Sequence, residues 1–252
     1  MANKAVISLS GGMDSTMLLM YLLANGYDEV RAYSFKYGQK HGVELKKVKK
    51  NVKFLKEKGF NITHQVIDLI DCFSDSASSL HVGGPEIPEG LYNQSNMMST
   101  VVENRNVIFS SIIFGKALGW ANTSGNQVDI TLGTHSGDHC IYRDCTEESH
   151  QAARHLFKIS NWNSEKVDYI APFNDIDKGG VLKAGLESME KLGFSRSDMK
   201  KVLKNTHTCY NPDSEGRSCG KCGSCTERLE AFEYVKSIKH WKWLKEDPVK
   251  YQ

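Results

Sequence analysis

The chain has 252 residues, of which 40% are hydrophobic and 25% charged, a composition that fits one large domain or one domain with an appendage. Its 32 Lys and Arg against 30 Asp and Glu leave a net charge of +2, which excludes any argument from global charge for binding nucleic acid or a membrane. The sequence has no apolar run of about 18 residues and no signal-peptide pattern, so we expect a soluble, cytoplasmic protein with no membrane partner.

Strand-like and helix-like segments alternate along the N-terminal part of the chain. The β-prone segments are residues 5–9, 30–36 and 62–69. Residues 15–25 carry apolar side chains at helical spacing up to Gly26. A second apolar helix face precedes Gly59 and consists of Leu45, Val48, Val52 and Leu55. This order predicts a chain that opens as strand and helix in alternation.

The alternation continues to about residue 192. Helices are expected at residues 107–119, 147–160 and 178–192, and strands at 128–133 and 167–173. Strands separated by helices imply a parallel sheet that is covered on both faces. The expected fold class is therefore α/β, with a Rossmann-like parallel sheet flanked by helices.

Two regions depart from this alternation. Residues 70–102 form a long connection rich in Gly and Pro, which favours a mobile lid or binding loop over a plain turn, with disorder as the alternative. Near the C-terminus, a charged stretch follows a group of cysteines. Its residues Leu229, Phe232 and Val235 have the spacing of a helix that docks on the rest of the protein.

The stretch SGGMDS, residues 10–15, separates the first strand from the first helix. A strand that runs into Ser-Gly-Gly and then into a helix forms a concave turn of backbone N–H groups at a helix N-terminus, where the dipole favours an anion. Cβ atoms at positions 11 and 12 would hinder close approach of the backbone, and Ser10 and Ser15 add hydroxyl donors. Phosphate is the expected occupant, and an ordinary N-cap is the alternative.

The lysine of the phosphate loop of kinases and GTPases is absent here, which indicates another nucleotide chemistry. SGGMDS resembles the S-G-G-x-D-S PP-loop of the ATP pyrophosphatases, which cleave ATP between its α- and β-phosphates and transfer AMP to an oxygen. The resemblance implies an adenine nucleotide alpha hydrolase-like fold, ATP as cofactor and Mg²⁺ near Asp14. It assigns the β- and γ-phosphates to Ser10, Gly11, Gly12, Asp14 and Ser15.

Four of the seven cysteines are clustered, which suits a metal site better than a disulfide framework. They are Cys209, Cys219, Cys222 and Cys225. Four thiolates suit a tetrahedral Zn²⁺ site, while an iron–sulfur cluster and a redox-active pair are the competing interpretations. Zinc is favoured because no Pro follows the last cysteine as in a ferredoxin-like run. We therefore expect a nucleotide-binding catalytic domain over residues 1–204 and a zinc-binding region with a C-terminal helix over residues 205–252.

Further motifs lie between the PP-loop and the cysteines. YGQKH at residues 37–41 is similar to Y-G-Q-R/K-H, and VVENRN at 101–106 to V-P-x-R-N. GTHSGDHCIYRDC at 133–145 is similar to G-x-x-x-x-D-x-x-x-Y-P-D-C-R, and a later Pro–Lys pattern and THTCYN at 206–211 complete the series. Over roughly residues 5–230, in order, the chain resembles the 7-cyano-7-deazaguanine synthases.

This resemblance implies a reaction in which ATP activates a poor electrophile. In the family, 7-carboxy-7-deazaguanine is adenylated, ammonia displaces AMP to give an amide, and a second ATP activates the amide oxygen so that the nitrile forms. Lys178 and Arg105 are expected to stabilise anionic groups, with Arg143 a weaker candidate and surface ion pairs as the alternative. The chain leaves no room for a glutaminase domain, so ammonia is expected as free ammonium or from a separate glutaminase.

By the same resemblance, the catalytic residues are Asp14, Ser15, Arg105 and Lys178, and Tyr37 and Gln39 join the PP-loop in binding the nucleotide. The substrate-binding residues are Arg105, Asn106, His135, Asp138, Tyr142 and Asp144. Carboxylates can accept hydrogen bonds from the guanine-like N–H edge, although loop capping is an alternative for them. His135 and His139 flank Asp138 at a spacing that also fits a second metal site, but the purine pocket is favoured.

Three positions depart from the family pattern: Glu103, Arg143 and Thr146 stand where Pro, Pro and Arg are usual. Because these positions are expected to border the purine pocket, they leave open a variant that stops at the amide or passes the acyl group to another amine. A tRNA-modifying PP-loop enzyme and a zinc module that recruits RNA or protein also compete with the synthase interpretation. A nucleic-acid partner is not favoured, and the oligomeric state, including a homodimer, stays open.

Overall fold

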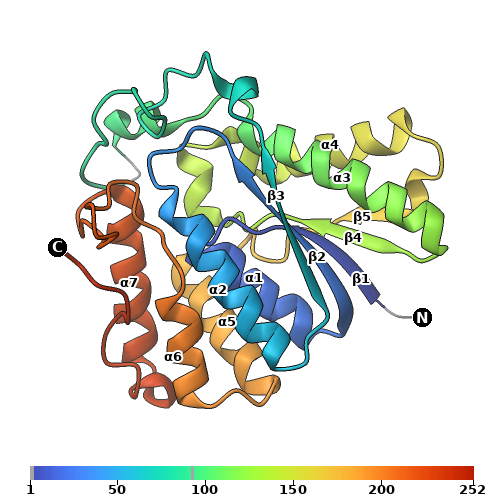
Figure 1. Ribbon diagram of the computed structural model, residues 1–252. Coiled ribbons are helices and arrows are strands. Elements are labelled where there is room, and N and C mark those ends of the chain that lie inside the picture. Colours follow the sequence, from blue (N-terminus) through green and yellow to red (C-terminus); the bar gives the residue numbers. More distant parts are fainter. Residues whose placement is uncertain (1–2, 92–93) are drawn as a thin grey trace.

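A computed structural model describes residues 3–91 and 94–252. Its parallel strands form one sheet with the order β3-β2-β1-β4-β5 (Figure 1). The strands are β1 (Asn3–Ser8), β2 (Tyr27–Lys36), β3 (Ile62–Asp68), β4 (Val128–Thr131) and β5 (Val167–Tyr169). The predicted parallel sheet is therefore confirmed. The fifth strand is shorter than the predicted 167–173, because the chain leaves β4 after the hydrogen bond from the Ile170 N–H to the Ile130 carbonyl.

Helices connect and cover these strands. They are α1 (Met13–Ala24), α2 (Val43–Glu57), α3 (Arg105–Ser124), α4 (Glu147–Ser160), α5 (Lys178–Lys191), α6 (Arg196–Lys204) and α7 (Gly223–Ser237). No helix was predicted at the position of α6. A capping box was its available signal, since Ser195 Oγ accepts from the Asp198 N–H while the Asp198 carboxylate accepts from the Ser195 N–H.

Two apolar layers lie on opposite faces of the sheet. Alternate residues of β1 serve different layers, because side chains along a strand point to opposite faces. Ala5 and Ile7 pack with α1, α2, α5, α6 and α7, whereas Val6 packs with α3 and Phe157 of α4. Figure 1 shows α3 and α4 on one side of the sheet and the other helices on the other side. The architecture is the Rossmann-like arrangement that the sequence predicted.

The long connection at residues 70–102 has its own packed side chains. Phe73, Leu80 and Met97 are buried, and Phe73 contacts the ring of Tyr37. Short 3-10 turns at Asp71–Phe73 and Ser95–Thr100 punctuate it. Residues 92–93 of the predicted loop lie outside the described residues. Because apolar residues anchor both halves, the connection is a structured loop over the part that the structure describes, and disorder there is the wrong interpretation.

The C-terminal helix docks mainly through the predicted face, with one exception. Phe232 and Val235 are buried as expected, but Leu229 is 37% exposed. Arg228 is buried in its place, where it pairs with Asp247 and donates to the hydroxyl of Thr206. A buried cation needs such partners, so the position of α7 is fixed by a polar cluster as well as by apolar packing.

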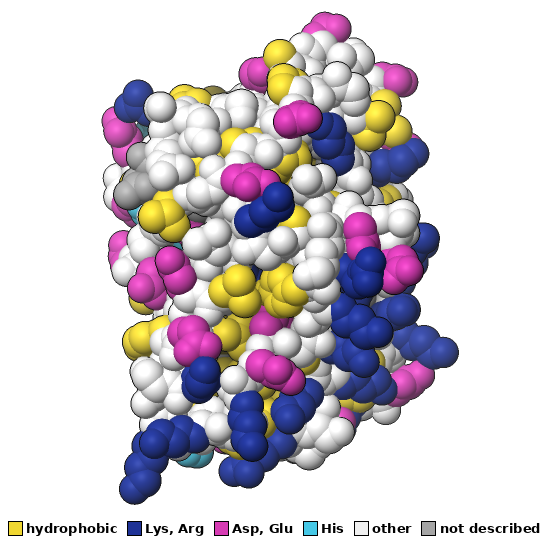
Figure 2. Space-filling view, turned by 90° about the vertical axis from the view of Figure 1, so that its left-hand side faces the viewer, with side chains coloured by type: hydrophobic (Ala, Val, Ile, Leu, Met, Phe, Trp, Pro, Cys, Tyr) yellow, Lys and Arg dark blue, Asp and Glu magenta, His cyan; other side chains and the backbone are white. Residues whose placement is uncertain are grey.

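The lysines of α2 lie mostly on its solvent side. The exposed ones are Lys46, Lys49, Lys50, Lys53 and Lys56, and α6 adds Lys200, Lys201 and Lys204. Figure 2 shows Lys and Arg side chains gathered along one edge of the molecule. These lysines form a solvated face of the two helices. In the described part of the chain, no helix combines the length and apolarity needed to cross a bilayer.

Candidate functional site

A cavity opens at the carboxyl ends of β1, β2 and β4. The chain leaves β1 toward β2 on one side, and β4 lies on the other side, so the connections diverge at this edge. Ligands of open α/β sheets bind at such a switch point. The wall includes the following residues among others: Ser10, Gly12, Asp14, Ser15, Tyr37, His41, Glu44, Arg105, Asn106, Asp138, Tyr142, Cys145, His207 and Tyr210. Much of the predicted site is thus brought together.

The Ser-Gly-Gly turn begins α1 without a side-chain cap. Gly12 is the N-cap, and no side chain accepts a hydrogen bond from the first turn. Ser10 Oγ instead accepts from the Gly12 N–H at 3.1 Å and lies 3.0 Å from Ser15 Oγ. The ordinary N-cap interpretation of this serine is therefore wrong. The helix N-terminus presents N–H groups and two hydroxyls to the cavity, which suits a phosphate.

Gly11 is required because the turn packs closely against α2. Its φ is +96°, and a Cβ there would lie 2.5 Å from the Glu44 carbonyl oxygen and 2.7 Å from Val48 Cγ2. The missing side chain therefore allows the turn to pack on α2. On the other side, a Cβ on Gly133 would lie 2.7 Å from the Ser15 N atom. Two close backbone approaches thus hold the turn in place.

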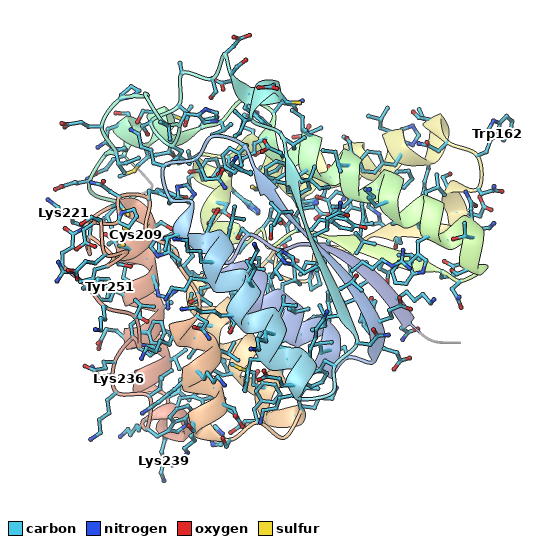
Figure 3. All side chains as sticks on the ribbon, in the orientation of Figure 1. Trp162, Cys209, Lys221, Lys236, Lys239 and Tyr251 are labelled. Atoms are coloured by element: carbon cyan, nitrogen blue, oxygen red, sulfur yellow. The ribbon has the colours of Figure 1, made fainter. Side chains whose placement is uncertain are left out.

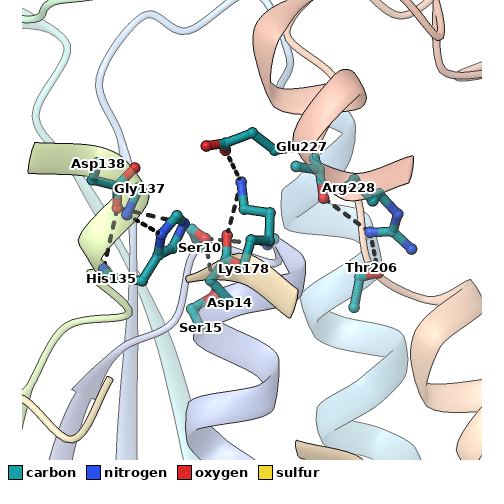
Figure 4. A network of polar contacts seen from close by, with 12 residues as sticks. Ser10, Asp14, Ser15, His135, Gly137, Asp138, Lys178, Thr206, Glu227 and Arg228 are labelled. Carbon is teal, nitrogen blue, oxygen red and sulfur yellow. Dashed lines mark hydrogen bonds and ion pairs between the residues drawn. The ribbon is translucent and has the colours of Figure 1, made fainter. Parts of the chain in front are cut away.

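Lys178 lies behind the turn and joins two carboxylates (Figure 4). Its Nζ is 2.7 Å from Glu227 Oε2 and 3.7 Å from Asp14 Oδ2, and its side chain is only 6% exposed. Burial disfavours the charge of Lys178, yet the carboxylates of Asp14 and Glu227 hold its pKa above the ordinary value. A cation is therefore fixed beside the expected phosphate position.

Asp14 keeps one carboxylate oxygen for another partner. Its Oδ1 is buried and makes no hydrogen bond within the described residues, while its Oδ2 faces Lys178. An unpaired buried carboxylate oxygen is costly unless a cation or donor reaches it. Oxygen is the ligand that Mg²⁺ prefers, so Asp14 fits a magnesium ion bound with the phosphates.

Arg105 and aromatic rings form the opposite end of the cavity. The guanidinium lies over the rings of Tyr37 and Tyr142, and its Nη1 donates to the Tyr37 hydroxyl at 3.5 Å. Asn106, the next residue of α3, donates through Nδ2 to Cys145 Sγ at 3.2 Å. A cation held between flat rings can bind a carboxylate on a planar ring system.

Some residues assigned from the sequence support the wall without being part of it. Gln39 accepts from the Tyr37 N–H and donates to the Phe35 carbonyl and Glu44. His135 is 1% exposed and accepts from the Gly137 N–H. Asp144 accepts from the Asn106 N–H at the start of α3. These three side chains shape the loops that carry Tyr37, Asp138 and Asn106.

None of the three departures from the family pattern is among the lining residues described, although each lies within two residues of one, as expected for positions that border the cavity. Glu103 accepts from the Ser76 hydroxyl at 2.6 Å, and the Thr146 hydroxyl accepts from the Ser149 N–H at the start of α4. Arg143 is exposed and is not among the lining residues described, so the structure does not support its role in anion stabilisation. These three positions therefore leave the described wall of the cavity unchanged.

Several wall residues were not assigned a role from the sequence. His41 and Glu44 come from the start of α2, Cys145 from the turn before α4, and His207 and Tyr210 from the segment that leads to the cysteines. His41 stands in the YGQKH motif, which was its available signal. Cys145 stands in GTHSGDHCIYRDC, and His207 and Tyr210 stand in THTCYN, so these motifs were their available signals. Glu44 belongs to none of the quoted motifs, and it reaches the cavity through the packing of α2 on the glycine turn.

The four predicted cysteines converge near the start of α7. Their Sγ atoms all lie within 4.8 Å of one another, and Cys209, Cys222 and Cys225 are buried. Sulfur atoms accept from backbone N–H groups, as in the 3.2 Å contact from the Cys219 N–H to Cys209 Sγ. Figure 3 places Cys209 near the N-terminal end of α7, close to the C-terminal segment with Tyr251. The arrangement fits a tetrahedral metal ion bound by thiolates.

A second metal site at the 135–139 turn is not supported. Within the described ranges, the cysteine cluster is the one group of three or more His, Cys, Asp or Glu side chains with converging ligand atoms. His139 Nε2 lies 3.1 Å from Asn174 Oδ1, away from His135. Neither His135 nor His139 is among the lining residues described for the cavity, so their place in the purine pocket stays a prediction.

Glu227 links the cysteine cluster to the glycine turn. It lies one turn into α7, two residues after Cys225, and a Cβ on Gly137 would lie 2.9 Å from its Oε1.

We expect Glu227→Ala to lower turnover about tenfold or more, because Lys178 loses its nearest carboxylate. Glu227→Gln should lower turnover less, because its side chain keeps a hydrogen-bond acceptor for Lys178. Steady-state turnover of ATP measures this.

Glu230→Ala, an exposed position on the same helix, is the control for the Glu227 variants. Both Glu227 variants should keep their bound metal, since neither change touches a cysteine. Equal activity in Glu227→Ala and the unchanged protein would contradict a role in holding Lys178.

The chain was compared with known proteins. Residues 4–236 match the sequence model of a family described as Queuosine biosynthesis protein QueC. A 7-cyano-7-deazaguanine synthase of Marinomonas sp. is 43% identical over 232 residues, covering 92% of this chain and 94% of that protein. The synthase of Caldicellulosiruptor saccharolyticus is 37% identical, covering 99% and 96%, and that of Pseudoalteromonas atlantica is 36% identical over the whole of both chains.

A solved structure of U34-tRNA thiolase NcsA from Methanococcus maripaludis, with its 4Fe-4S cluster, aligns with 99% of this chain and 77% of that one. Its TM-score is 0.37 and its sequence identity 14%, too remote a likeness to bear on function. The family match and the curated relatives each span nearly the whole chain, and the chain belongs to the QueC family.

Proposed function

We propose that this protein is a 7-cyano-7-deazaguanine synthase that uses ATP and ammonia to convert 7-carboxy-7-deazaguanine into the nitrile. The observation that carries the proposal is a single cavity with two different ends. The glycine turn and Asp14, with Lys178 paired to Asp14 behind them, belong to one end, and Arg105 with its aromatic neighbours belongs to the other. Such a cavity suits the meeting of a nucleotide and an aromatic acid, and the curated relatives are named for the corresponding nitrile, 7-cyano-7-deazaguanine.

At the first end, Ser10, Gly11, Gly12, Asp14 and Ser15 would hold the β- and γ-phosphates of ATP. The Asp14 carboxylate would bind the accompanying Mg²⁺, which offsets phosphate charge when bound. Lys178 would stabilise the negative charge that develops as pyrophosphate leaves, since a fixed buried cation acts strongly where water is excluded. Gln39 would support this end through its hydrogen bond to Glu44, whose backbone packs on the glycine turn.

At the second end, Arg105 would hold the substrate carboxylate, and the rings of Tyr37 and Tyr142 would bound the purine plane. Asp138 lines the cavity and can accept from the guanine-like N–H groups. Asn106, His135 and Asp144 would act in substrate binding through the loops and the helix start that they shape. A carboxylate held here faces the nucleotide end, as adenylation requires.

The reaction would proceed in two activations. The carboxylate oxygen attacks the α-phosphorus, pyrophosphate leaves, and ammonia displaces AMP to give the amide. The amide oxygen then attacks a second ATP, and loss of AMP and two protons from the amide nitrogen leaves the nitrile. Because the ring contacts are the same in acid and amide, one pocket can serve both steps.

We further propose that the four cysteines bind one Zn²⁺, and that residues 205–252 form the zinc-binding region beside a catalytic domain of residues 1–204. Buried thiols that converge without disulfides suit a reducing compartment, which supports a cytoplasmic location. Ammonia would come as free ammonium or from a separate glutaminase.

A homodimer is also proposed. The exposed apolar side chains of Leu156, Ile159 and Trp162, on and after α4, support it.

The experiment for the proposed function is product analysis with 7-carboxy-7-deazaguanine, ATP, magnesium and ammonium. We expect AMP and pyrophosphate, with the amide appearing before the nitrile. Because each activation consumes one ATP, AMP should reach two equivalents per nitrile. Mass spectrometry of the base and chromatography of the nucleotides measure both quantities.

Three different results would each point to another activity. Release of ADP and phosphate would contradict the PP-loop assignment. One AMP per amide, without nitrile at long times in excess ATP, would indicate a variant that stops at the amide. AMP formation that requires added tRNA would indicate a tRNA-modifying enzyme.

A further inference from the structure

Two buried polar side chains of the cavity wall have no role in the site described so far. His41 and Glu44 are 5% and 7% exposed, and they lie just before α2 and in its first turn, respectively. His41 Nε2 is 3.7 Å from Glu44 Oε1, which also accepts from Gln39 Nε2 at 3.3 Å. A buried carboxylate with so few donors is costly unless a ligand completes it.

The pair lies between the two ends of the cavity. The Glu44 backbone packs directly against the glycine turn, where a Cβ on Gly11 would be 2.5 Å from the Glu44 oxygen. On the other side, Gln39 connects Glu44 to the backbone of Tyr37, whose hydroxyl contacts Arg105. A small molecule beside this pair would therefore lie near the point where phosphate and carboxylate meet.

The pair offers acceptors rather than donors. His41 Nδ1 is buried and makes no hydrogen bond with any described residue. Burial, with Arg105 and His207 nearby, lowers the pKa of His41 to about 3, so the imidazole is neutral and keeps a lone pair. The partner complementary to a carboxylate and a neutral imidazole is a small molecule that carries several N–H groups.

We propose that Glu44 and His41 form the ammonium subsite of this enzyme, in which Glu44 accepts a proton and His41 orients the nitrogen. This assignment rests on the proposed function, because it names the place of the second substrate. The chemical class is an ammonium ion or ammonia, and none of the residues previously assigned to the site has this task.

The proton balance explains why a carboxylate is needed there. Ammonium has no lone pair, so it must lose a proton before its nitrogen can attack the acyl carbon. The new C–N bond forms as the bond from that carbon to the AMP oxygen breaks, and the nitrogen then loses a second proton to give the amide. Glu44 receives the first proton, and the leaving AMP or solvent receives the second.

The electrostatics of Glu44 agree with this role. Burial raises the pKa of Glu44 to about 8, whereas the hydrogen bond from Gln39 and the charge of Arg105 act in the opposite direction. At neutral pH this carboxyl is mostly protonated before the ligand binds, and a bound cation lowers its pKa, so the carboxylate forms with ammonium in place and can then take up a proton from it. The position of Glu44 and His41 identifies the site, and the raised pKa of Glu44 suits that carboxyl to proton transfer.

The test separates adenylation from ammonia use. Glu44→Gln keeps the shape and the acceptor for Gln39 but removes the carboxylate, and Glu57→Gln at the exposed end of α2 is its control. We expect unchanged exchange of radiolabelled pyrophosphate into ATP with 7-carboxy-7-deazaguanine, which needs no ammonia. The KM for ammonium should rise by about 10- to 100-fold, the loss that one hydrogen bond to a charged group accounts for.

Hydroxylamine adds a second readout, because it is already uncharged at neutral pH and needs no proton removal before it attacks. We expect Glu44→Gln to form the hydroxamate nearly as fast as the unchanged protein does. His41→Asn should raise the KM for ammonium as well, and it replaces Glu44→Gln if that variant does not fold.

The possible failures are distinguishable. If the unchanged protein shows no acid-dependent exchange, the proposed function is wrong. If exchange is present but both variants keep the KM for ammonium, the ammonium subsite is wrong. Loss of exchange in a folded Glu44→Gln protein would also overturn the assignment, since Glu44 would then serve adenylation. An equal loss with hydroxylamine would overturn its role as proton acceptor.

Discussion

Asparagine in place of Asp14 is expected to lower kcat by about 100- to 1,000-fold while leaving the protein folded, a loss like that of one preorganised electrostatic group. The substitution keeps the size of the side chain but removes its charge. Asp14 Oδ1 would lose its suitability for magnesium, and Lys178 would keep only the carboxylate of Glu227. Charge compensation at the phosphates is therefore weakened in two ways at once.

The measurement is AMP formation under saturating ATP, with thermal unfolding of the same samples. Asp28→Asn, at an exposed position at the start of β2, is the matched control and should keep full activity. Ser15→Ala should lower turnover in the same direction by removing a hydroxyl from the turn. Unfolding of Asp14→Asn would point to a structural role at the start of α1, and unchanged turnover would exclude Asp14 from the chemistry.

The sequence predicted those elements whose apolar pattern is long and regular. α1, α2 and α5 lie close to their predicted positions, because buried faces at helical spacing leave a clear periodicity. α6 was missed, because its nine residues, which follow the turn at Gly193, carry too short an apolar pattern for periodicity alone to identify a helix. Its capping box was a stronger signal than its apolar residues.

The candidate site was predictable where one local motif carries it. The glycine turn is such a motif, and the family-like series added Lys178 and Arg105. Glu227 could not be predicted in this way, because it lies 49 residues from Lys178 in the sequence and meets it only when α7 packs beside α5. His41 and Glu44 reach the cavity because Gly11 allows α2 to approach the turn, which is a tertiary contact.

The glycines also show how a correct prediction can rest on an incomplete reason. Gly11 was expected to keep space for a phosphate. Its absent Cβ would instead meet α2, at the Glu44 carbonyl, and its positive φ disfavours other residues. Sequence patterns thus identify a position where a side chain is excluded. Which residue such a side chain would contact can be seen only in the folded structure.

Serine in place of Cys222 is expected to abolish stoichiometric zinc binding and to lower Tm by about 10 °C. Structural metal sites contribute folding free energy directly, and losing one costs several kcal/mol. For a chain of this size, 1 kcal/mol corresponds to about 2–4 °C in Tm. The unchanged protein should contain about one zinc per chain, held by Cys209, Cys219, Cys222 and Cys225. Elemental analysis and thermal unfolding measure the two effects.

Cys72→Ser is the control, because this cysteine is exposed and lies in the long connection. A Cys222→Ser protein with normal zinc content and unchanged Tm would contradict the structural metal site. Iron and sulfide in the purified protein, with a brown colour, would show that the cysteines hold an iron–sulfur cluster instead of zinc.

The Cys222 substitution should also reach the nucleotide end of the cavity. Cys222 is the N-cap of α7, and Glu227 holds Lys178 from the next turn of the same helix. If the metal fixes this helix start, its loss should lower turnover even at a temperature where the variant is folded. Glu227→Gln should then add little further loss in the Cys222→Ser background, because both changes act through Lys178. Independent, additive losses would show that the metal stabilises the fold without positioning Lys178.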